Sequence, residues 1–295
     1  MADAKPPTIA PAAAARWQHA APARPPWLHE EVGRRMAERL EWIRLAPQAW
    51  ADWEPVRGGI EAHRAVAARY PKAQRWVAEH EARRADVARK ALANPWWKIN
   101  AAPVHHGDAP EGGVQMLWAN MALHMAADPQ ALIAQWHRAL ATDGFLMFSC
   151  FGPDTLRELR TLYAAQGWPP PAHEFTDMHD WGDMLVHCGF AEPVMDMERI
   201  TLTWPTPERM LTELRELGAN LHRSRFQALR GRGWRQRLHD EAARSLRGPE
   251  GGLALTFEIV YGHALKPAPR MRMADQSAIS VKDMQALLRS GRKPG

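Results

Sequence analysis

Polar side chains stand directly after apolar stretches of the sequence, at positions suited to binding a small molecule. Asn120 and His124 follow the apolar run 114–119, and Glu79 ends the shorter run 75–79. In open α/β sheets, ligands bind outside the carboxyl ends of the strands. An asparagine at the end of a buried strand is poorly explained by packing alone. These positions therefore predict a ligand site at the carboxyl edge of a parallel sheet.

The sequence shows no arrangement typical of a metal site or of an oxidised, exported protein. Its 14 histidines form no HExxH pattern, and Cys150 and Cys188 have no CxxC partner, so we expect no metal ion. Two cysteines cannot form a disulfide framework, which favours a reducing compartment. No apolar run approaches the roughly 18 residues of a membrane span, and the first residues lack a signal-peptide core. We expect a cytoplasmic protein that does not enter a membrane.

Residues 114–150 predict the strand, helix and strand that position Asn120 and His124. Asp128 and Pro129 open the helix, with the aspartate as N-cap and the proline where its missing N–H costs nothing. Apolar side chains then recur at three- and four-residue intervals, at Leu132, Ile133, Trp136 and Leu140. Asp143 and Gly144 are expected to end the helix, before a continuous apolar strand over 145–150. The segment therefore predicts a right-handed crossover of a parallel sheet.

The rest of the chain also alternates between helical and strand patterns. Helical periodicity covers 30–43, 60–70, 81–92, 153–165 and 177–188, and the helix over 81–92 is expected to be a charged surface helix. Strand patterns cover 75–79, 194–204 and 253–265. A first strand is expected within 44–59, where the sequence is a poor strand former. Further helices are expected after Pro207 and around 234–246.

Two groups of motifs resemble the class I S-adenosylmethionine-dependent methyltransferases. The central group is LWANM at 117–121, Asp128-Pro129 and Asp143-Gly144-Phe145. The downstream group is more specific, with FGPDTLREL at 151–159, FTDM at 175–178, LRELGA at 214–219 and LTFEIVYG at 255–262. It resembles the malonyl-acyl-carrier-protein O-methyltransferases of biotin synthesis, and the likeness covers about residues 35–265.

The resemblance implies a Rossmann-like α/β fold, with a mostly parallel seven-stranded sheet and a helical cap insertion at about 205–250. It implies S-adenosylmethionine as the cofactor and methylation of the free carboxylate of a malonyl thioester on acyl carrier protein. The methyltransferase-like domain is expected over 29–265. Residues 1–28, rich in alanine and proline, are expected to be a disordered lead-in, and 266–295 a flexible tail with a short helix after Ser280. The alternative is a non-catalytic scaffold that has lost cofactor binding.

The resemblance places the cofactor's methionine end on the loop after the first strand. Asp52 and Gly58 match the family's glycine-rich loop, and Gly59 can restore the turn if the register is shifted. Glu54 and Val56 stand where glycines are expected. A carboxylate at Glu54 repels the cofactor's own carboxylate, and Val56 adds a side chain where backbone N–H groups should come close. A plain turn before a helix explains the two glycines equally well.

Three further residues match positions that contact the cofactor in this family. The resemblance implies that Glu79 is the acid for the ribose hydroxyls, that Asp108 faces the adenine, and that Asn120 contacts the cofactor from the end of the central strand. A surface glutamate at the start of a helix and a Gly-Asp turn are the alternatives for Glu79 and Asp108.

Methyl transfer to a carboxylate needs orientation and exclusion of water rather than a general base, because the nucleophile is already anionic. His124 is the catalytic candidate, as a hydrogen-bond partner of the attacking carboxylate. Arg215 is a candidate to pair with a substrate carboxylate, and Trp118 and Phe175 are candidate walls of an acyl pocket. Ordinary helix-face and core positions are the alternatives for all four residues.

The positive charge of the chain favours an acidic partner. The formal net charge is +5 and the pI is about 9.5. Arginines gather in the cap region, where Arg232, Arg235 and Arg237 are candidates to dock acyl carrier protein. A solvated helix face is the simpler alternative. Trp234 and Phe226 interleave the arginines, as in surfaces that bind RNA, but no RNA-binding motif is present, so we expect no nucleic-acid partner.

Overall fold

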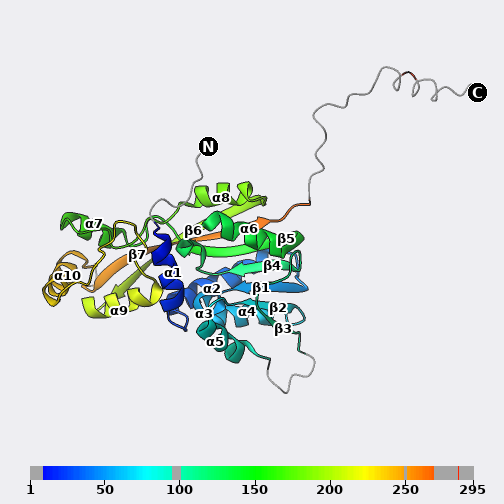
Figure 1. The fold of residues 1–295 in the computed structure, drawn as a ribbon, viewed down its shortest axis with the longest axis horizontal. Coiled ribbons are helices and arrows are strands. Elements are labelled where there is room, and N and C mark those ends of the chain that lie inside the picture. The colour runs from blue at the N-terminus through cyan, green and yellow to red at the C-terminus, as the bar shows by residue number, and fades with distance from the viewer. Residues whose placement is uncertain (1–8, 95–100, 249–250, 269–284, 286–295) are drawn as a thin grey trace, which may run out of the picture.

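The centre of the molecule is a seven-stranded sheet in the order β3-β2-β1-β4-β5-β7-β6 (Figure 1). The computed structural model describes residues 9–94, 101–248, 251–268 and 285. Its strands are β1 Ala49–Trp53, β2 Gln74–Ala78, β3 Val104–His106, β4 Val114–Ala119, β5 Leu140–Phe151, β6 Ala191–Trp204 and β7 Leu253–Leu265. Strands β1 to β5 pair in parallel, and β7 is antiparallel to both neighbours. The predicted Rossmann-like sheet is confirmed.

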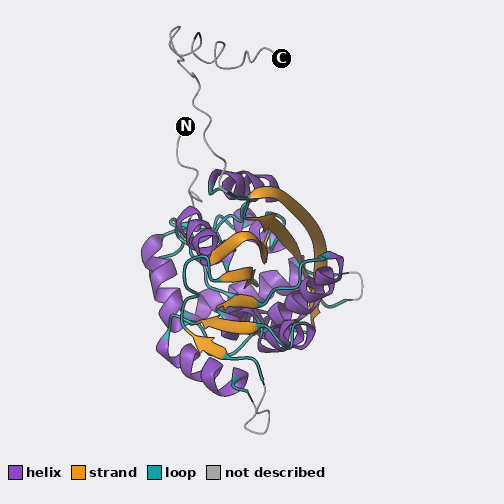
Figure 2. Cartoon of the chain, turned by 90° about the vertical axis from the view of Figure 1, so that its right-hand side faces the viewer, coloured by secondary structure: helices purple, strands orange, loops and turns teal. Residues whose placement is uncertain are grey.

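Helices cover both faces of this sheet (Figure 2). They are α1 Pro11–Ala20, α2 Trp27–Arg39, α3 Pro55–Gly58, α4 Ile60–Arg69, α5 Ala82–Leu92, α6 Pro129–Ala139, α7 Arg157–Ala165, α8 Met178–His187, α9 Pro207–Leu217 and α10 Arg232–Ser245, with 3-10 turns at Leu40–Trp42 and Leu123–Met125. Side chains alternate along β5, so that Phe145 and Met147 pack on the side of α2, whereas Leu146 and Phe148 pack with α6 and α8. This alternation divides the core into two apolar layers.

The crossover over 114–150 forms as expected, apart from one boundary. The Asp128 side chain accepts a hydrogen bond from the Ala131 N–H, as an N-cap does. Helix α6 then ends at Ala139, and β5 begins at Leu140 rather than after Asp143. Asp143 has φ of 61° and donates its backbone N–H to the Lys266 carbonyl, which ties the start of β5 to the end of β7. Pairing with a distant strand therefore sets this boundary.

The expected disorder of the lead-in is wrong for residues 11–20, which form α1. Its small side chains Ala13 and Ala14 pack with Ile9 against Leu221 of the cap region. Ala10 also donates its backbone N–H to the Leu221 carbonyl over 2.8 Å. Alanine and proline composition suggested a disordered segment, but alanine also allows close packing on a partner far along the chain. Of the tail helix expected after Ser280, only Gln285, which is helical, belongs to the described residues.

Two helices, α9 and α10, occupy the segment predicted as a cap, between β6 and β7. Figure 1 shows them with α7 at one end of the sheet, with α1 crossing between this group and the side that carries α3, α4 and α5. The first helical turn of α9 is capped by Thr206, whose hydroxyl accepts from the Arg209 N–H. Residues of α9 and α10 line one cavity together with Phe151, the last residue of β5, so the cap covers the carboxyl end of this strand.

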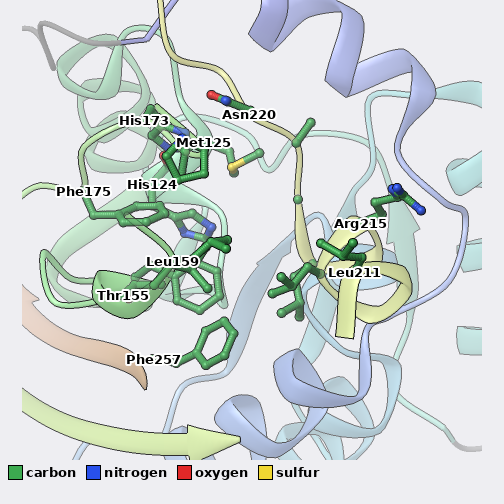
Figure 3. A pocket seen from close by; sticks show the side chains of 18 of the residues that line it. His124, Met125, Thr155, Leu159, His173, Phe175, Leu211, Arg215, Asn220 and Phe257 are labelled. Atoms are coloured by element: carbon green, nitrogen blue, oxygen red, sulfur yellow. The ribbon is translucent and has the colours of Figure 1, made fainter. Parts of the chain in front are cut away.

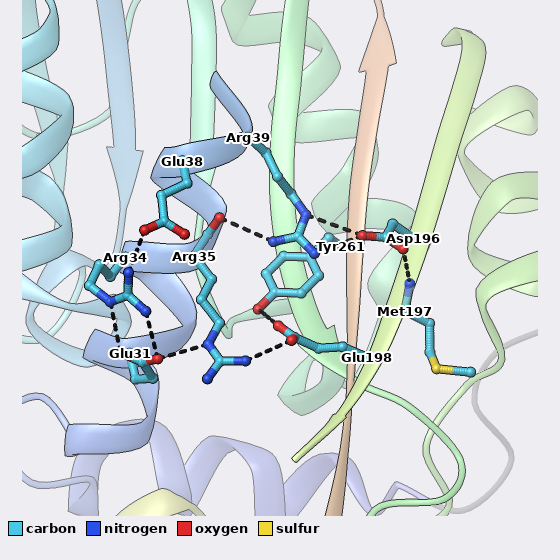
Figure 4. Close-up of polar contacts among 9 residues, drawn as sticks. All are labelled: Glu31, Arg34, Arg35, Glu38, Arg39, Asp196, Met197, Glu198 and Tyr261. Atoms are coloured by element: carbon cyan, nitrogen blue, oxygen red, sulfur yellow. Dashed lines mark hydrogen bonds and ion pairs between the residues drawn. The ribbon is translucent and has the colours of Figure 1, made fainter. Parts of the chain in front are cut away.

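An ion-pair network fixes α2 against the two antiparallel strands (Figure 4). Arg35 and Arg39 of α2 bind Glu198 and Asp196 of β6, each over 2.7 Å. The Tyr261 hydroxyl of β7 donates to Glu198, and the Arg39 guanidinium lies 3.7 Å from the centre of the Tyr261 ring. Because α2 also reaches the loop after β1, this network helps to set the position of that loop.

Candidate functional site

A cavity of about 460 Å³ lies at the carboxyl end of β5 (Figure 3). Its walls come from α7, from the loop before α8, and from α9 and α10 of the cap. Most of the lining is apolar, and includes Phe151, Leu159, Phe175, Leu211, Leu214 and Phe257. The size lies within the range of ordinary small-molecule pockets. The geometry suits a short apolar or partly polar chain.

His124 is the polar residue of this cavity with the clearest unmet hydrogen-bonding capacity. It lies in the 3-10 turn after β4, is 4% exposed, and packs its ring 4.5 Å from that of Phe151. Neither of its ring nitrogens has a partner among the described residues. Burial holds the pKa of His124 well below its usual value, so the ring is neutral and has one donor and one acceptor. Such a group indicates a ligand with polar atoms.

His173 is a second buried imidazole on the cavity wall, and the sequence patterns did not indicate it. Its Nε2–H donates to the backbone carbonyl of His124 over 2.9 Å, and its Nδ1 has no partner among the described residues. Burial lowers the pKa of His173 to about 4, which leaves Nδ1 as an acceptor near neutral pH. A lone histidine in a proline-rich loop carried no sequence signal for this role.

The structure brings together three of the four residues predicted to meet the substrate. His124, Phe175 and Arg215 all line the cavity, with Arg215 on the wall opposite the histidines (Figure 3). Trp118 does not line it. This side chain is 1% exposed and packs with Trp50. Side chains alternate along β4, and Trp118 lies on the face of the sheet that packs against α2. The roles of the other three residues stay predictions.

The arginines predicted to dock a partner begin α10. Arg232, Arg235 and Arg237 are exposed, and no acidic residue stands in the first turn of this helix. Positive charges at a helix N-terminus oppose the helix dipole, so they do not stabilise α10. Just before them, the Arg230 guanidinium lies 4.0 Å from the centre of the Trp234 ring. Exposed positive charge that does not stabilise its own helix is consistent with a binding surface.

The loop after β1 begins with a left-handed residue and continues as the short helix α3. Glu54 has φ of 53°, in the left-handed region that glycine adopts readily. Val56, in the short helix α3, is fully buried and packs with Val77, Ala88 and Leu92. Its backbone N–H donates to the Glu79 carboxylate over 2.8 Å. The loop is therefore held directly against the acid that ends β2.

Glu79 has internal partners for both carboxylate oxygens. Oε1 accepts from Val56, and Oε2 accepts from the Arg84 Nε over 3.3 Å. The side chains of Glu79 and Arg84 are 2% and 1% exposed. Burial, followed by the nearby charge of Glu54, raises the pKa of Glu79 to about 7. Both oxygens therefore have internal partners, and the side chain presents almost no surface to a ribose hydroxyl.

Arg84 corrects the prediction that α5 is only a charged surface helix. Besides Glu79, its guanidinium donates to the backbone carbonyl of Gln18 in α1 over 2.7 Å and lies 3.9 Å from Glu54. The sequence signal that was missed is its spacing. Arg84, Ala88 and Leu92 recur every fourth residue and share the buried face of the helix.

Asn120 clamps the loop rather than facing a ligand. Its amide donates to the backbone carbonyls of His29 and Gly58, and its oxygen accepts from the Ser149 hydroxyl over 2.6 Å. A Cβ on Gly58 would stand 2.9 Å from the Asn120 backbone oxygen, so glycine is required by close approach. The predicted cofactor role of Asn120 is replaced by this internal one, because both amide protons are already used.

The helix after the loop has its N-terminus filled by a carboxylate of the chain. Glu30 of α2 accepts from the backbone N–H groups of Ile60, Glu61 and Ala62 at 2.8–3.1 Å. Gly59, with φ of 132°, passes so close that a Cβ would stand 2.8 Å from the Glu30 carboxylate. The N–H groups best placed to bind an outside anion are therefore occupied.

The two aspartates predicted at the cofactor site lie apart. Asp52 is 1% exposed and its carboxyl lies 2.8 Å from the His63 ring in α4. Burial raises the pKa of Asp52 and lowers that of His63 to about 3, so the imidazole is uncharged near neutral pH and the two groups form no ion pair. Asp108 is exposed and binds His80, whose ring centre lies 4.5 Å from that of Trp53 in a tilted arrangement. Asp108 remains accessible, whereas Asp52 does not.

Taken together, the residues present do not fit S-adenosylmethionine. The cofactor needs backbone N–H groups for its carboxylate and a free acid for its ribose. Here those N–H groups bind Glu30 and Glu79, and Glu79 is also paired with Arg84. Within the described ranges, no group of residues could hold a metal ion, and no helix is long and apolar enough to span a membrane.

The strand order, the antiparallel β7 and the cap define the fold of a class I methyltransferase. Solved structures agree, although at low identity. The YcgJ protein of Bacillus subtilis aligns with a TM-score of 0.51 and 11% identity, over 80% of this chain and 99% of its own. A putative methyltransferase of Bacillus halodurans aligns with a TM-score of 0.50 and 17% identity, over 80% and 100%.

Sequence relatives identify the family within this class. A malonyl-[acyl-carrier protein] O-methyltransferase of Gallionella capsiferriformans is 38% identical over 259 residues, which is 83% of this chain and 86% of that protein. The enzyme of the same name from Halorhodospira halophila is 32% identical over 269 residues, 90% of each chain. No protein-family model matches the sequence. The chain belongs to the malonyl-acyl-carrier-protein O-methyltransferase family.

Proposed function

We propose that this chain binds a malonyl-type acyl group, carried as a thioester on acyl carrier protein, in the cavity between the sheet and the cap. The observation that carries the proposal is His124, a neutral imidazole on the wall of an apolar cavity with two ring nitrogens that lack a partner among the described residues. A buried polar group without a partner is costly, and a ligand carbonyl or carboxylate would relieve that cost by accepting the ring N–H. The named substrate of the relatives carries both groups.

The cap supplies the second support for this substrate class. Arg215 of α9 is among the lining residues, and its guanidinium, which Figure 3 shows directed away from the opposite wall, would bind a carboxylate in the cavity after a rotation of the side chain. Arg232, Arg235 and Arg237 form an exposed positive surface on the neighbouring helix α10. A strongly acidic carrier protein would be attracted to that surface by charge complementarity.

Two functions are compatible with a chain that binds the acyl group. The first candidate is methylation of the malonyl carboxylate in biotin synthesis. It is the reaction for which the relatives are named, and family membership supports it. The second candidate is a non-catalytic family member that binds the carrier-linked acyl group without methylating it. The contacts of Glu30, Glu79 and Arg84 favour the second candidate, because they use the groups that the cofactor needs.

The test of the proposal compares malonyl-acyl carrier protein with the same carrier protein lacking the acyl group, both without cofactor. The malonyl form should bind this chain at least about 10-fold more tightly, equivalent to about 1.4 kcal/mol. His124→Phe should remove most of that difference, whereas the exposed control His187→Phe should not. Equal binding of both carrier forms to the wild-type chain would refute the proposal.

The two candidates are separated in the same samples. After incubation with S-adenosylmethionine, the mass of the carrier-linked acyl group shows whether a methyl group has been added. Acyl-dependent binding with no added methyl group supports the second candidate, and methylation establishes the first.

A further inference from the structure

We propose that the cofactor site of this chain is filled by its own side chains, and that the chain adopts its closed fold without binding S-adenosylmethionine. The side chains are Glu30, Glu54, Glu79 and Arg84, and helix α1 covers them. The inference does not rest on the acyl-binding proposal, because it concerns the loops after β1 and β2 rather than the cavity under the cap.

The distance between the loop and the acid leaves no space for a ribose. The Val56 N–H meets the Glu79 carboxylate directly over 2.8 Å. A sugar whose hydroxyls bind Glu79 would have to separate these two groups. Val56 is held in place by its apolar cluster with Val77, Ala88 and Leu92, so the loop cannot move outward without exposing apolar side chains.

Arg84 occupies the side of Glu79 that the loop leaves open. Its guanidinium joins the acid at the end of β2 to the Gln18 carbonyl in α1, over 3.3 Å and 2.7 Å. Its side chain is 1% exposed. A ligand that reaches Glu79 would have to separate this buried guanidinium from its partners. That separation is unfavourable unless the ligand replaces the lost contacts.

The charge of the site also opposes the cofactor's carboxylate. Glu30, Glu54 and Glu79 converge on the loop and the start of α4, and Arg84 is a cation that contacts two of them. The N–H groups of Ile60, Glu61 and Ala62, which would otherwise attract an anion, are bonded to Glu30. An incoming carboxylate would meet like charges and no free donors at these positions.

Helix α1 is fixed over the site by arginines of the domain. Arg57 of α3 donates to the Arg24 and Glu216 carbonyls, and its guanidinium lies 5.3 Å from the centre of the Trp17 ring. Arg84 holds Gln18 by hydrogen bonds to its backbone carbonyl and its side-chain oxygen. The loop, α1 and α9 are thereby tied together by side chains of the protein, which is the closed arrangement the proposal requires.

The first experiment is calorimetry of the full chain with S-adenosylmethionine and with S-adenosylhomocysteine. We expect no binding of either at millimolar concentration. A micromolar dissociation constant for either compound would overturn the proposal. Binding of malonyl-acyl carrier protein is measured on the same preparation, so a failure of this inference is distinguishable from a failure of the acyl-binding proposal.

The second experiment tests whether Arg84 blocks the cofactor site, by removing the side chains that fill it. In the background Glu54→Gly and Val56→Gly, Arg84→Ala should gain binding of S-adenosylhomocysteine by at least about 10-fold. The matched control in the same background is Arg89→Ala, an exposed arginine on the same helix that pairs with Asp86. If Arg84→Ala unfolds the protein, Arg84→Met keeps most of the alkyl chain and removes the guanidinium with its charge and its hydrogen bonds to Glu79 and Gln18. A folded Arg84 variant that binds no better than the Arg89 control would overturn the assignment.

Discussion

Glu79 and Arg84 form an ion pair in which both side chains are almost fully withdrawn from solvent, with the Arg84 Nε 3.3 Å from the Glu79 carboxylate. A charge buried in this way is stable only while its partner remains. The pair joins the end of β2 to α5 and, through Gln18, to α1. It therefore links the cofactor edge of the sheet to the helix that covers it.

Removal of Arg84 should destabilise the fold more than removal of any exposed arginine. At about pH 8, above the Glu79 pKa of about 7, Arg84→Ala leaves the Glu79 carboxylate buried without its cation, and we expect a loss of about 3–5 kcal/mol in the free energy of unfolding. Urea denaturation measures this value, with Arg89→Ala as the control that should leave it unchanged. The double variant Glu79→Gln with Arg84→Met should recover part of the loss, because no unpaired charge remains. Equal stability of the Arg84 and Arg89 variants would contradict a buried pair.

The sheet could be predicted from the sequence because local patterns specify it. The apolar alternation of 253–265 predicted the bounds of β7, and the caps and periodicity around Asp128 predicted α6. The short strand β1 was poorly predicted, because its stability comes from pairing with β2 and β4 rather than from its own composition.

The candidate site was less predictable, because its contacts join residues far apart in the chain. Gly58 and Asn120 were both singled out, but nothing local indicates that one binds the other. Glu30 at the start of α4 and Gln18 beside Arg84 depend on the docking of α2 and α1, which composition does not reveal. Trp118 was misplaced for a related reason, since only the finished sheet decides which face of β4 meets the core.

Buried histidines should make the protein sensitive to acid. Burial lowers the pKa of His29 to about 3, of His63 to about 3 and of His173 to about 4, against 6.5 for an unperturbed histidine. The pKa of each histidine is lower in the folded state than in the unfolded state. The contribution of these histidines to the free energy of unfolding is therefore complete above pH 6.5 and is lost as the pH falls toward the folded-state pKa. At pH 5 each histidine should have lost about 2 kcal/mol.

Two carboxyl groups should offset part of this effect with the opposite sign. The pKa of Glu79 is raised to about 7 and that of Asp52 is also raised, so each favours folding at low pH and loses that contribution as the pH rises through its folded value. The free energy of unfolding is to be measured from pH 4.5 to 7.5. His173→Phe should flatten its fall below pH 6.5, and Glu79→Gln should steepen that fall. An unchanged profile in His173→Phe would show that this ring does not stay neutral in the fold.

Asn120 should prove essential for stability, whatever its part in binding. Asn120→Ala leaves the His29 and Gly58 carbonyls and the Ser149 hydroxyl without their partner, and we expect a loss of about 3 kcal/mol from unsatisfied buried groups. Asn120→Asp should be at least as damaging, because a carboxylate cannot donate to two carbonyls. Thermal and urea unfolding measure both variants. Wild-type stability in either variant would show that the amide does not clamp the loop.

The arginines at the start of α10 should control how fast an acidic partner associates. Changing Arg232, Arg235 and Arg237 to glutamate reverses an exposed charge, and rim charges mainly steer the encounter of two proteins. We expect the association rate with malonyl-acyl carrier protein to fall by about 10-fold or more at low salt, while the dissociation rate changes little. The effect should shrink as salt rises, because exposed charges are screened within about 10 Å at 0.1 M.

Specificity of that surface is tested by charge-matched controls and competition. Arg44→Glu reverses an exposed arginine away from the cap and should leave the association rate unchanged. Unlabelled carrier protein should displace labelled carrier protein, whereas RNA of equal charge should not. RNA that competes equally well would show a general anion-binding surface. In that case neither the shape of the carrier protein nor its acyl group would contribute to affinity beyond the charge. The carrier-protein assignment would fail on that result even if the salt dependence were as expected.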